Sequence, residues 1–316
     1  MSEPIRILIS ACLLGDQVRY DGGHKRDAFL VETLGRFVEW IRVCPEVDCG
    51  LPVPRESMRL LGEPAHPRLV TGKTGVDLTE RMEQFARSMM KAYEAMDLCG
   101  YICKSNSPSS GMARVKVYSD SGMPARSGAG IFTRIFMEHF PLVPVEEEGR
   151  LQNPLLREAF VERVFCLRRW RDMLRGGLSR RRLIGFHTDH KLLLLSHGRA
   201  GHDELGRLVA RAKSIPLRRL HDGYLALFMT ALAVKATVRK HTDVLLHMAG
   251  HLKLVLSGDE RQELQDIIRQ YHSGLVPHIV PITLMRHHVR KHRVAYLERQ
   301  VYLNPDPVEL MLRNHV

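Results

Sequence analysis

Long apolar runs and abundant cysteine are both missing from this chain of 316 residues. No apolar run approaches the roughly 20 residues that a helix needs to cross a bilayer, so we expect no contact with a membrane. Six cysteines are too few for a disulfide scaffold in a chain of this length. We therefore expect reduced thiols that are free to bind a metal.

Targeting and repeat signals are missing as well. The first residues, Met-Ser-Glu-Pro-Ile-Arg, do not combine a basic segment with an apolar segment, so they do not resemble a signal peptide. No internal repeat and no low-complexity segment interrupts the sequence. Together these observations predict a cytoplasmic protein.

Charge divides the chain into two halves. Residues 1–150 hold 19 Lys and Arg against 20 Asp and Glu, a net charge of −1, whereas residues 151–316 hold 28 against 15, a net charge of +13. Histidine follows the same division, with 3 residues in the first half and 14 in the second. We expect two domains with these boundaries. The basic half is typical either of a nucleic-acid partner or of a solvated helical surface.

The first half alternates between strand-like and helix-like patterns. Strands are predicted at Ile5–Ala11, Arg42–Val47, Tyr101–Lys104, Ala113–Tyr118 and Leu142–Val145, with a short extended piece at Arg68–Thr71. Helices are predicted over 27–40, 77–98 and 130–140. This alternation favours an α/β domain with a mostly parallel sheet in three layers.

The second half shows helical spacing only. Helices are predicted at Pro154–Leu174, at Pro216–Leu256 with a break near Thr242, at Arg261–Tyr271 and at Pro281–His292. We therefore expect an all-α domain, with the boundary between the halves at Glu146–Pro154.

Three cysteines lie within or just after predicted strands. These are Cys12, Cys44 and Cys103. The C-terminal ends of parallel strands meet at one edge of a sheet, where sites are built, and three thiols there would form a metal or iron–sulfur site. Cys12 and Cys44 are 32 residues apart rather than in a Cys-x-x-Cys pair, so buried free cysteines are the more common alternative.

Polar residues accompany these cysteines. Glu46, two residues after Cys44, has the position of a proton donor or acceptor, or of a surface carboxylate. Asp21-Gly22-Gly23-His24-Lys25 could bind an anion or a heterocycle carbonyl, or form a plain polar turn. Three alternating serines, Ser105, Ser107 and Ser109, could offer hydroxyl and N–H groups to a polar ligand.

Histidine pairs mark the basic half. His187 and His190 are spaced i, i+3, whereas His247 and His251, like His288 and His292, are spaced i, i+4. Such pairs can share a helical face and bind a metal. Without an acidic residue or cysteine at a diagnostic spacing, a structural metal is the less favoured interpretation. The cationic run over 286–293 could contact phosphates or be solvated.

Five motifs of the first half occur in the order found in a known bacterial family. They are Ser-Ala-Cys-Leu-Leu-Gly, Tyr-Asp-Gly-Gly-His-Lys-Arg, Val-Cys-Pro-Glu-Val, Gly-Leu-Pro-Val-Pro-Arg-Glu and Lys-Ser-Asn-Ser-Pro-Ser-Ser-Gly-Met. They resemble the family named domain of unknown function 523. In the second half, Phe-His-Thr-Asp-His-Lys-Leu-Leu-Leu-Leu-Ser-His and Arg-Gln-Val-Tyr-Leu-Asn-Pro resemble family 1722, the YbgA-like domain.

The first resemblance implies a chemistry. Its family includes thiouracil desulfidases, α/β domains that hold a 4Fe–4S cluster on three cysteines, so that the fourth iron can take sulfur from a thiolated uracil. An open iron is a thiophilic Lewis acid, which fits this reaction. By motif, Cys12 and Cys44 match two ligands, Glu46 the acidic residue near the substrate, and Ser105 and Ser107 the serine loop.

One position departs from the family pattern. The third cysteine of the family belongs to Ser-Pro-Ser-Cys-Gly, but here Ser110 stands at its place. Serine is a poorer ligand for iron than a thiolate. Either another thiol substitutes, Cys103 or Cys49 being the candidates, or the cluster is weak or lost.

These observations support a leading hypothesis and two rivals. The leading hypothesis is an iron–sulfur enzyme that desulfidates thiolated uracil-type bases or nucleosides, with Asp21–Lys25 and the serines orienting the base. The first rival is a protein that binds tRNA or DNA through its basic half, with a cluster-free first domain. The second is a binder of small molecules without redox chemistry.

Overall fold

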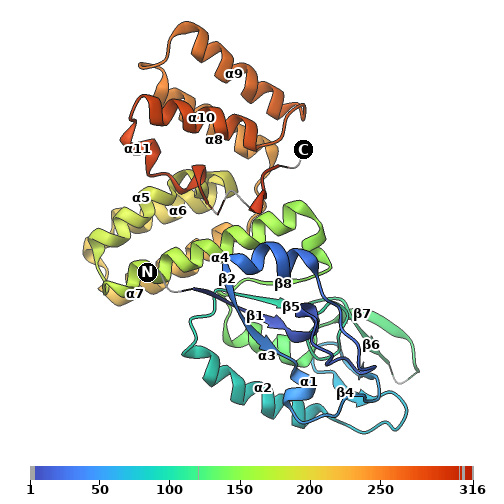
Figure 1. The fold of residues 1–316 in the computed structure, drawn as a ribbon. Coiled ribbons are helices and arrows are strands. Elements are labelled where there is room, and N and C mark those ends of the chain that lie inside the picture. Colours follow the sequence, from blue (N-terminus) through green and yellow to red (C-terminus); the bar gives the residue numbers. More distant parts are fainter. Residues whose placement is uncertain (1–3, 120, 306, 308–309, 315–316) are drawn as a thin grey trace. The chain divides into compact units, whose positions relative to one another are not determined.

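The computed structural model describes residues 4–119, 121–305, 307 and 310–314. Contacts within the chain divide it into two compact units, Met1–Leu156 and Arg157–Val316 (Figure 1). Among the described residues, no helix is both long enough and apolar enough to cross a membrane.

A four-stranded parallel sheet forms the centre of the first unit. Its order is β2-β1-β5-β8, made by Val38–Val43, Ile5–Ser10, Gly100–Cys103 and Val145–Glu147. The register pairs Ile7 with Trp40 on one side and with Gly100 on the other. The branched run of β1 suits this central place because both faces of the strand are covered, and Ile7, Leu8 and Ile9 are fully buried.

Two amphipathic helices pack against each other in this unit. They are α2 (Thr79–Glu94) and α3 (Ile131–His139). Tyr101 of β5 contacts Phe132 and Phe136 of α3, with ring centroids 6.2 and 5.0 Å apart. This aromatic contact attaches the helices to the sheet, so the predicted α/β layering around a parallel sheet is confirmed.

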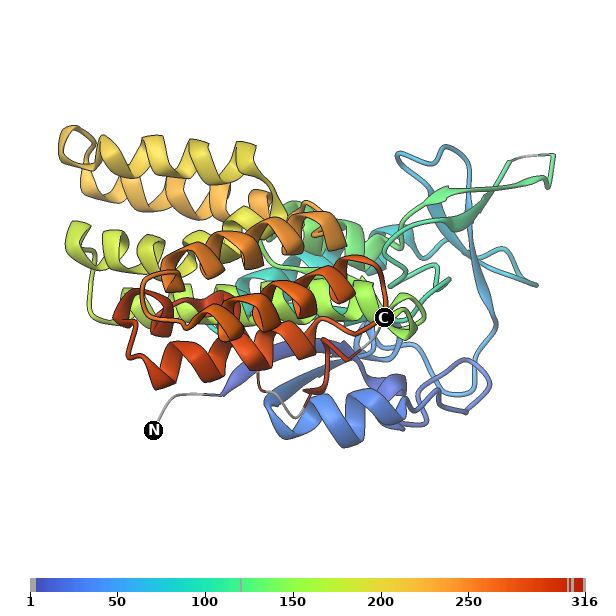
Figure 2. The same cartoon turned by 90° about the horizontal axis from the view of Figure 1, so that it is seen from above.

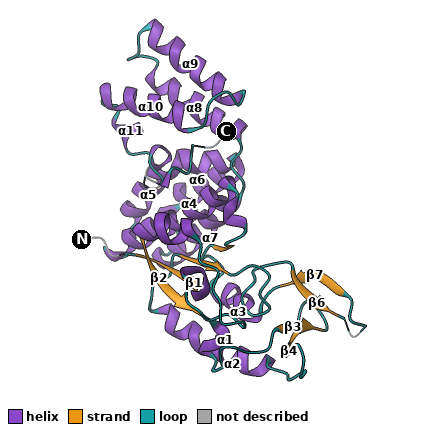
Figure 3. Ribbon diagram, turned by 45° about the vertical axis from the view of Figure 1, so that its right-hand side comes forward, coloured by secondary structure: helices purple, strands orange, loops and turns teal. Residues whose placement is uncertain are grey.

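A second, smaller sheet lies in the same unit and was not predicted as such. Its order is β4-β3-β6-β7, made by Arg68–Thr71, Met58–Leu61, Val115–Tyr118 and Pro124–Gly128. The β6–β7 hairpin extends from the body of the unit (Figure 3). β4 and β6 agree with the predicted extended segments. β3 was missed because it lies in a stretch rich in Pro and Gly, which is typical of a loop, and no element was predicted over β7.

The helix predicted over 27–40 is wrong in its second half. Helical turns cover only Phe29–Thr33 and Leu34–Arg36, and β2 begins at Val38. The segment Val38-Glu39-Trp40-Ile41-Arg42-Val43 instead pairs along the whole of β1. β-Branched and aromatic residues favour such pairing, so tertiary pairing overrides the local helical spacing. The strand predicted at Arg42–Val47 therefore ends earlier, and α1 (Pro45–Asp48) follows it.

The second unit contains helices and no strand among its described residues, as predicted. Its helices run side by side in Figure 2, where they are drawn from yellow-green to red. They are α4 (Pro154–Arg175), α5 (Arg180–His197), α6 (Arg199–Ala210), α7 (Leu217–Ala233), α8 (Val238–Leu252), α9 (Gly258–His272), α10 (Ile279–Lys291) and α11 (Ala295–Glu298). In the core of this unit Trp170 stacks on Tyr224, and Phe186 meets both rings edge-to-face.

Helix ends in this unit are set by capping side chains. The break predicted near Thr242 lies earlier, where Thr237 caps α8 by accepting a hydrogen bond from the Lys240 N–H. Ser257 and Glu260 form a reciprocal capping box at the start of α9. Such caps satisfy N–H groups that have no partner inside the helix.

Candidate functional site

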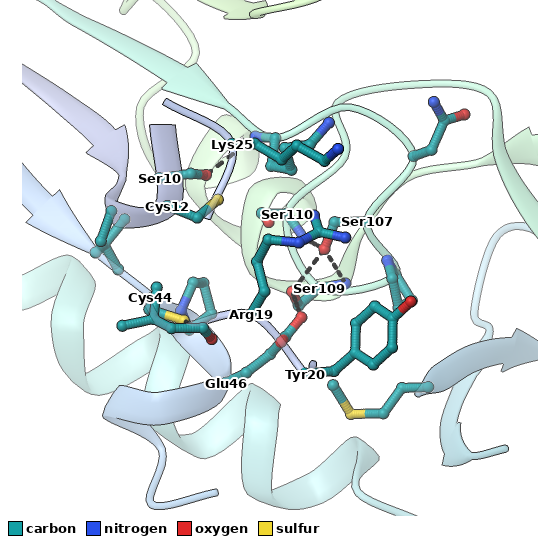
Figure 4. Close-up of a pocket in the computed structure, with 18 of the residues that line it drawn as sticks. Ser10, Cys12, Arg19, Tyr20, Lys25, Cys44, Glu46, Ser107, Ser109 and Ser110 are labelled. Carbon is teal, nitrogen blue, oxygen red and sulfur yellow. Dashed lines mark hydrogen bonds between the residues drawn. The ribbon is translucent and has the colours of Figure 1, made fainter. Parts of the chain in front are cut away.

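A cavity of about 390 Å³ opens at the C-terminal ends of β1, β2 and β5 (Figure 4). This volume is in the range of small-molecule sites. The chain leaves β1 to form β2 on one side and later returns to form β5 on the other. Ligands of parallel sheets bind at such a reversal of strand order. The lining residues that matter below are Cys12, Arg19, Tyr20, Lys25, Cys44, Glu46, Arg55, Met58, Lys104, Ser105, Ser107, Ser109 and Ser110.

Two thiols line this cavity from neighbouring strands. Cys12 lies in a helical turn directly after β1, and Cys44 directly follows β2 and begins α1. Burial, together with the nearby Cys44, raises the pKa of the Cys12 thiol to about 11. The pKa of Cys44 is also raised, mainly by burial. Both groups are therefore neutral thiols in this structure, and a bound metal ion would have to displace their protons.

Ser110 lines the same cavity from the loop after β5. The residue is 4% exposed, and its hydroxyl has no hydrogen-bond partner among the described residues. Its backbone is fixed, because its carbonyl accepts a hydrogen bond of 2.7 Å from the Thr133 hydroxyl of α3. Cys12, Cys44 and Ser110 thus bring two sulfur atoms and one hydroxyl oxygen to the cavity from segments that follow three different strands.

The loop carrying Ser110 is packed tightly against the start of α3. The Phe132 N–H donates to the Ser109 carbonyl at 2.9 Å, and the Gly130 N–H donates to the Gly111 carbonyl at 2.8 Å. A Cβ at Gly130 would approach the Ser109 carbonyl carbon to 2.4 Å. Only glycine permits this approach, which holds the serine loop at the rim of the cavity.

The two other candidate thiols lie elsewhere. Cys103 is fully buried in β5, where its thiol contacts the Glu146 carbonyl at 3.5 Å. Cys49 follows α1, and its thiol donates to the Glu46 carbonyl at 3.2 Å. Neither residue lines the cavity. Cys103 points away because side chains alternate along a strand, and the helical turn of α1 carries Cys49 past the rim.

Glu46 ends a chain of hydroxyl groups in the cavity. The Ser109 hydroxyl donates to the Glu46 carboxylate at 2.7 Å, and the Ser107 and Ser109 hydroxyls are 2.9 Å apart. Figure 4 shows this chain facing the two cysteines, with Arg19 extending between them. The arrangement links a carboxylate to the cavity through two groups that can each pass a proton.

Arg55 holds the other side of the Glu46 carboxylate. The two side chains form an ion pair and are only 5% and 15% exposed. Arg55 also donates to the Val18 carbonyl at 3.0 Å. Because Val18 and Glu46 belong to different segments of the rim, this guanidinium fixes both the carboxylate and the loop around it.

Ser105 serves a different purpose from Ser107. Its N–H and its hydroxyl both donate to Glu148, at 2.7 and 2.9 Å, and Lys104 forms an ion pair with the same carboxylate. Ser105 therefore anchors the loop to the segment after β8, although it also lines the cavity.

Of the predicted loop Asp21-Gly22-Gly23-His24-Lys25, only Lys25 lines the cavity. Asp21 accepts a hydrogen bond from the Gly23 N–H at 3.0 Å, and His24 accepts one from the Arg26 N–H at 3.2 Å. Gly22 has φ of 75°, as a tight turn requires. These side chains thus stabilise a turn, which is the plainer of the two interpretations of this sequence.

Several lining residues were not singled out from the sequence. Arg19, Tyr20, Arg55 and Met58 complete the wall, with Arg55 inside the Gly-Leu-Pro-Val-Pro-Arg-Glu motif. That motif was the only signal for Arg55, since no spacing rule brings it next to Glu46. Tyr20 begins the Tyr-Asp-Gly-Gly-His-Lys-Arg motif, whereas no motif and no spacing marked Arg19 or Met58.

Comparison with known proteins connects both units to families. Residues 7–148 match the family model of 2-thiouracil desulfurase, and residues 191–307 match that of protein of unknown function (DUF1722). The uncharacterized protein YbgA of Escherichia coli is 29% identical over 48% of this chain and 90% of its own length. The uncharacterized protein YbbK of Bacillus subtilis is 31% identical over 40% of this chain and 85% of its own.

A solved structure is also similar in sequence. It is a [4Fe-4S]-dependent thiouracil desulfidase, TudS, which is 31% identical and aligns with 47% of this chain and 93% of its own, at a TM-score of 0.40.

Proposed function

Since the chain belongs to the 2-thiouracil desulfurase family through residues 7–148 and to DUF1722 through residues 191–307, we propose that its cavity removes sulfur from a thiolated pyrimidine base. One observation carries the proposal: Cys12, Cys44, Glu46 and the serine loop, distant in sequence, line a single cavity of small-molecule size. Thiophilic donors and a carboxylate with hydroxyl groups are what this reaction needs.

The proposed reaction exchanges one atom and needs no electron donor. The carbon–sulfur bond of the base breaks, the oxygen of a water molecule takes the place of sulfur on that carbon, and sulfide leaves with the two protons of the water. A thiouracil and water thus give uracil and hydrogen sulfide.

An iron–sulfur cluster is the cofactor that the sequence resemblance implies, and the donors of the cavity fit a cluster with mixed ligands. Cys12 and Cys44 would supply two thiolates. The Ser110 hydroxyl, unpartnered among the described residues, would supply the third bond through oxygen. When bound, the cluster supplies a thiophilic Lewis acid for the sulfur of the base.

Glu46 would handle the protons of the incoming water. Its carboxylate accepts from Ser109 and is paired with Arg55, so it is held at the cavity wall in one orientation. A carboxylate in this position can take a proton from water as the oxygen attacks carbon. The Ser107–Ser109 pair offers a path by which that proton returns to the cavity.

The remaining wall would orient the base. The Tyr20 ring and the Met58 thioether offer flat and apolar surfaces on which a pyrimidine can stack. Arg19 and Lys25 offer cationic donors for its carbonyl oxygens. Stacking with polar contacts at the edges would hold the thiocarbonyl toward the two cysteines.

The test is anaerobic reconstitution of the full chain with iron and sulfide, followed by iron analysis, visible absorption and a 2-thiouracil turnover assay. Cys12→Ser and Cys44→Ser should lose the cluster absorption and the activity. Ser110→Ala should lose iron faster than the unchanged protein. Cys49→Ser and Cys103→Ser are matched controls and should retain both properties.

One result would overturn the proposed function, and another would change the assignment of the third ligand. A folded, colourless wild-type protein without turnover would remove the enzymatic function. Loss of the cluster in Cys49→Ser or Cys103→Ser, with retention in Ser110→Ala, would instead reassign the third ligand.

A further inference from the structure

A second group of potential metal ligands lies in the helical unit, where α9 begins and α10 ends. The Lys291 ammonium donates to the Glu260 carboxylate at 2.6 Å and so joins the two helices, which pack together (Figure 1). The His292 N–H donates to the His288 carbonyl at 3.0 Å, so these two histidines are one helical turn apart. The i, i+4 spacing noted in the sequence is thus realised on one face.

Glu260, His288 and His292 converge. Each offers one potential ligand atom, and these three atoms all lie within 4.8 Å of one another. This group of three residues contains no cysteine, so it differs chemically from the cavity of the first unit.

The imidazoles of this group lack partners. His288 is 2% exposed, yet neither of its ring nitrogens has a hydrogen-bond partner among the described residues. The buried Nε2 of His292 is also unpartnered within the described chain. Buried polar atoms without partners are rare and costly, so unpartnered nitrogens on two neighbouring imidazoles indicate a group that should bond to one nitrogen of each ring.

We propose that Glu260, His288 and His292 bind one divalent transition-metal ion, with zinc preferred, which fastens the start of α9 to the end of α10. Two imidazoles and a carboxylate suit Zn²⁺, whereas Mg²⁺ and Ca²⁺ prefer oxygen donors only. The C-terminal end of α10 also carries the negative end of the helix dipole, which favours a cation.

The three ligand atoms have to move closer together to bind one zinc ion. Ligand atoms around tetrahedral zinc are about 3.3 Å apart, and the three atoms here lie within 4.8 Å of one another, so each pair has to approach by at most about 1.5 Å. One carboxylate oxygen of Glu260 stays on the Ser257 N–H of the capping box, at 2.8 Å, and the other oxygen, now on Lys291, turns toward the imidazoles. Its ion pair with Lys291 is then exchanged for the metal, and the Lys291 side chain, 51% exposed, is free to turn into solvent.

Lys291 therefore competes with the metal for the same carboxylate. Replacing it by methionine removes a positive charge beside the site and frees Glu260. We expect the Lys291→Met variant to bind zinc about tenfold more tightly than the unchanged protein. The gain comes from removing the repulsion between the Lys291 ammonium and the metal ion, which solvent screens only in part at the protein surface. If the histidines only stabilise the fold and bind no metal, Lys291→Met should not increase the affinity for zinc.

The experiment uses the full chain carrying Cys12→Ser and Cys44→Ser, so that the thiols of the first unit do not bind the probe. The metal-free protein is titrated with Zn²⁺ by calorimetry and with Co²⁺ by visible absorption. We expect one equivalent bound, a tetrahedral cobalt spectrum without thiolate charge transfer, and a melting temperature that rises with zinc concentration. His292→Gln should abolish all three signals.

His287→Gln is the matched control, because His287 is an exposed neighbour outside the group. It should bind zinc like its parent, and Glu260→Gln should bind it weakly. The proposal is overturned if the folded parent binds no zinc or cobalt, or if His292→Gln, with unchanged circular dichroism, binds as tightly as His287→Gln.

Discussion

At the scale of single residues, the character of the cavity depends on Ser110. Its hydroxyl oxygen lines the same wall as the Cys12 and Cys44 thiols and has no other partner among the described residues. An oxygen donor is harder than sulfur and holds iron less well. The proposed cluster should therefore be bound more weakly than one on three thiolates.

The substitution Ser110→Cys tests this difference. It adds the missing thiolate with a nearly equal side-chain volume at a position that lines the cavity, so we expect the reconstituted cluster to lose iron to a chelator several-fold more slowly. The measurement is the decay of visible absorption after addition of the chelator. Equal decay rates in the variant and the parent would show that residue 110 does not touch the cluster.

Glu46→Gln tests the proton-handling role. The amide keeps the size of the side chain but cannot accept a proton from water, so kcat for 2-thiouracil should fall by roughly 10²–10⁴-fold. Cluster absorption should stay unchanged, and Glu63→Gln, at an exposed carboxylate, should keep full activity. An unaltered kcat in Glu46→Gln would assign this residue to loop structure alone.

The sequence could predict the cavity only in part. Cys12, Cys44, Glu46 and Ser107 were all singled out, because strand ends and quoted motifs marked them. Whether Cys103 or Cys49 could replace the missing thiol was not decidable from spacing. That answer depends on which side of β5 a residue points to and on where a single turn of α1 ends, and both are properties of the folded chain.

At the scale of elements, the central strands β1 and β5 and several long helices were predicted, whereas most of β2 was missed and no helix was predicted over α5 or α6. β1 and α4 follow from buried runs and helical spacing that no competing pattern disturbs. β2 was confused with a helix because Phe29, Leu30 and Leu34 recur at helical spacing just before it. The segment forms a strand because it pairs with β1 along all six residues from Ile5 to Ser10.

Helix α5 should make the helical unit sensitive to acid. Burial lowers the pKa of His187 to about 4 and that of His190 to about 3. Both are neutral in the fold, whereas in the unfolded chain they take up protons near their ordinary pKa. Their contribution to the free energy of unfolding is therefore complete above pH 6.5, and it is lost as the pH falls toward their pKa values in the folded protein.

The expected slope is about 1.4 kcal/mol per pH unit for each histidine between about pH 6 and 5. Urea unfolding followed by the fluorescence of Trp170, in a Trp40→Phe background, measures the free energy of unfolding. His287→Gln, which removes an exposed histidine, should leave the slope unchanged. A flat free energy across this window would contradict the buried neutral state of both imidazoles.

His197, whose pKa is raised, does not change the expected slope of the free energy of unfolding between pH 6 and 5. Its partner Glu162 raises this pKa, although burial opposes the shift. A group whose pKa rises on folding contributes its full stability below its unfolded pKa, so it adds no slope between pH 6 and 5.

At the scale of the whole molecule, the two units differ in charge as well as in architecture. Residues 1–150, with a net charge of −1, carry the cavity, and residues 151–316, with a net charge of +13, carry most of the helices and of the histidines. Nucleic-acid binding by the second half stays a prediction from its charge. If the basic half binds RNA, affinity for tRNA should fall by tenfold or more between about 50 and 200 mM salt.

Filter binding or fluorescence anisotropy with labelled tRNA measures that dependence. The slope of log K against log salt reports how many phosphates are neutralised, at about −0.7 to −0.9 for each. Affinity that does not change with salt would remove the nucleic-acid interpretation and leave the charge as a solvated surface.

The central claim is that water oxygen replaces sulfur in a base held at the cavity. It is tested most directly by incubating the reconstituted protein with 2-thiouracil in ¹⁸O-labelled water and analysing the products by mass spectrometry. We predict uracil with one labelled oxygen, released together with one equivalent of sulfide. Recovery of unchanged 2-thiouracil from folded, cluster-loaded protein would contradict the account.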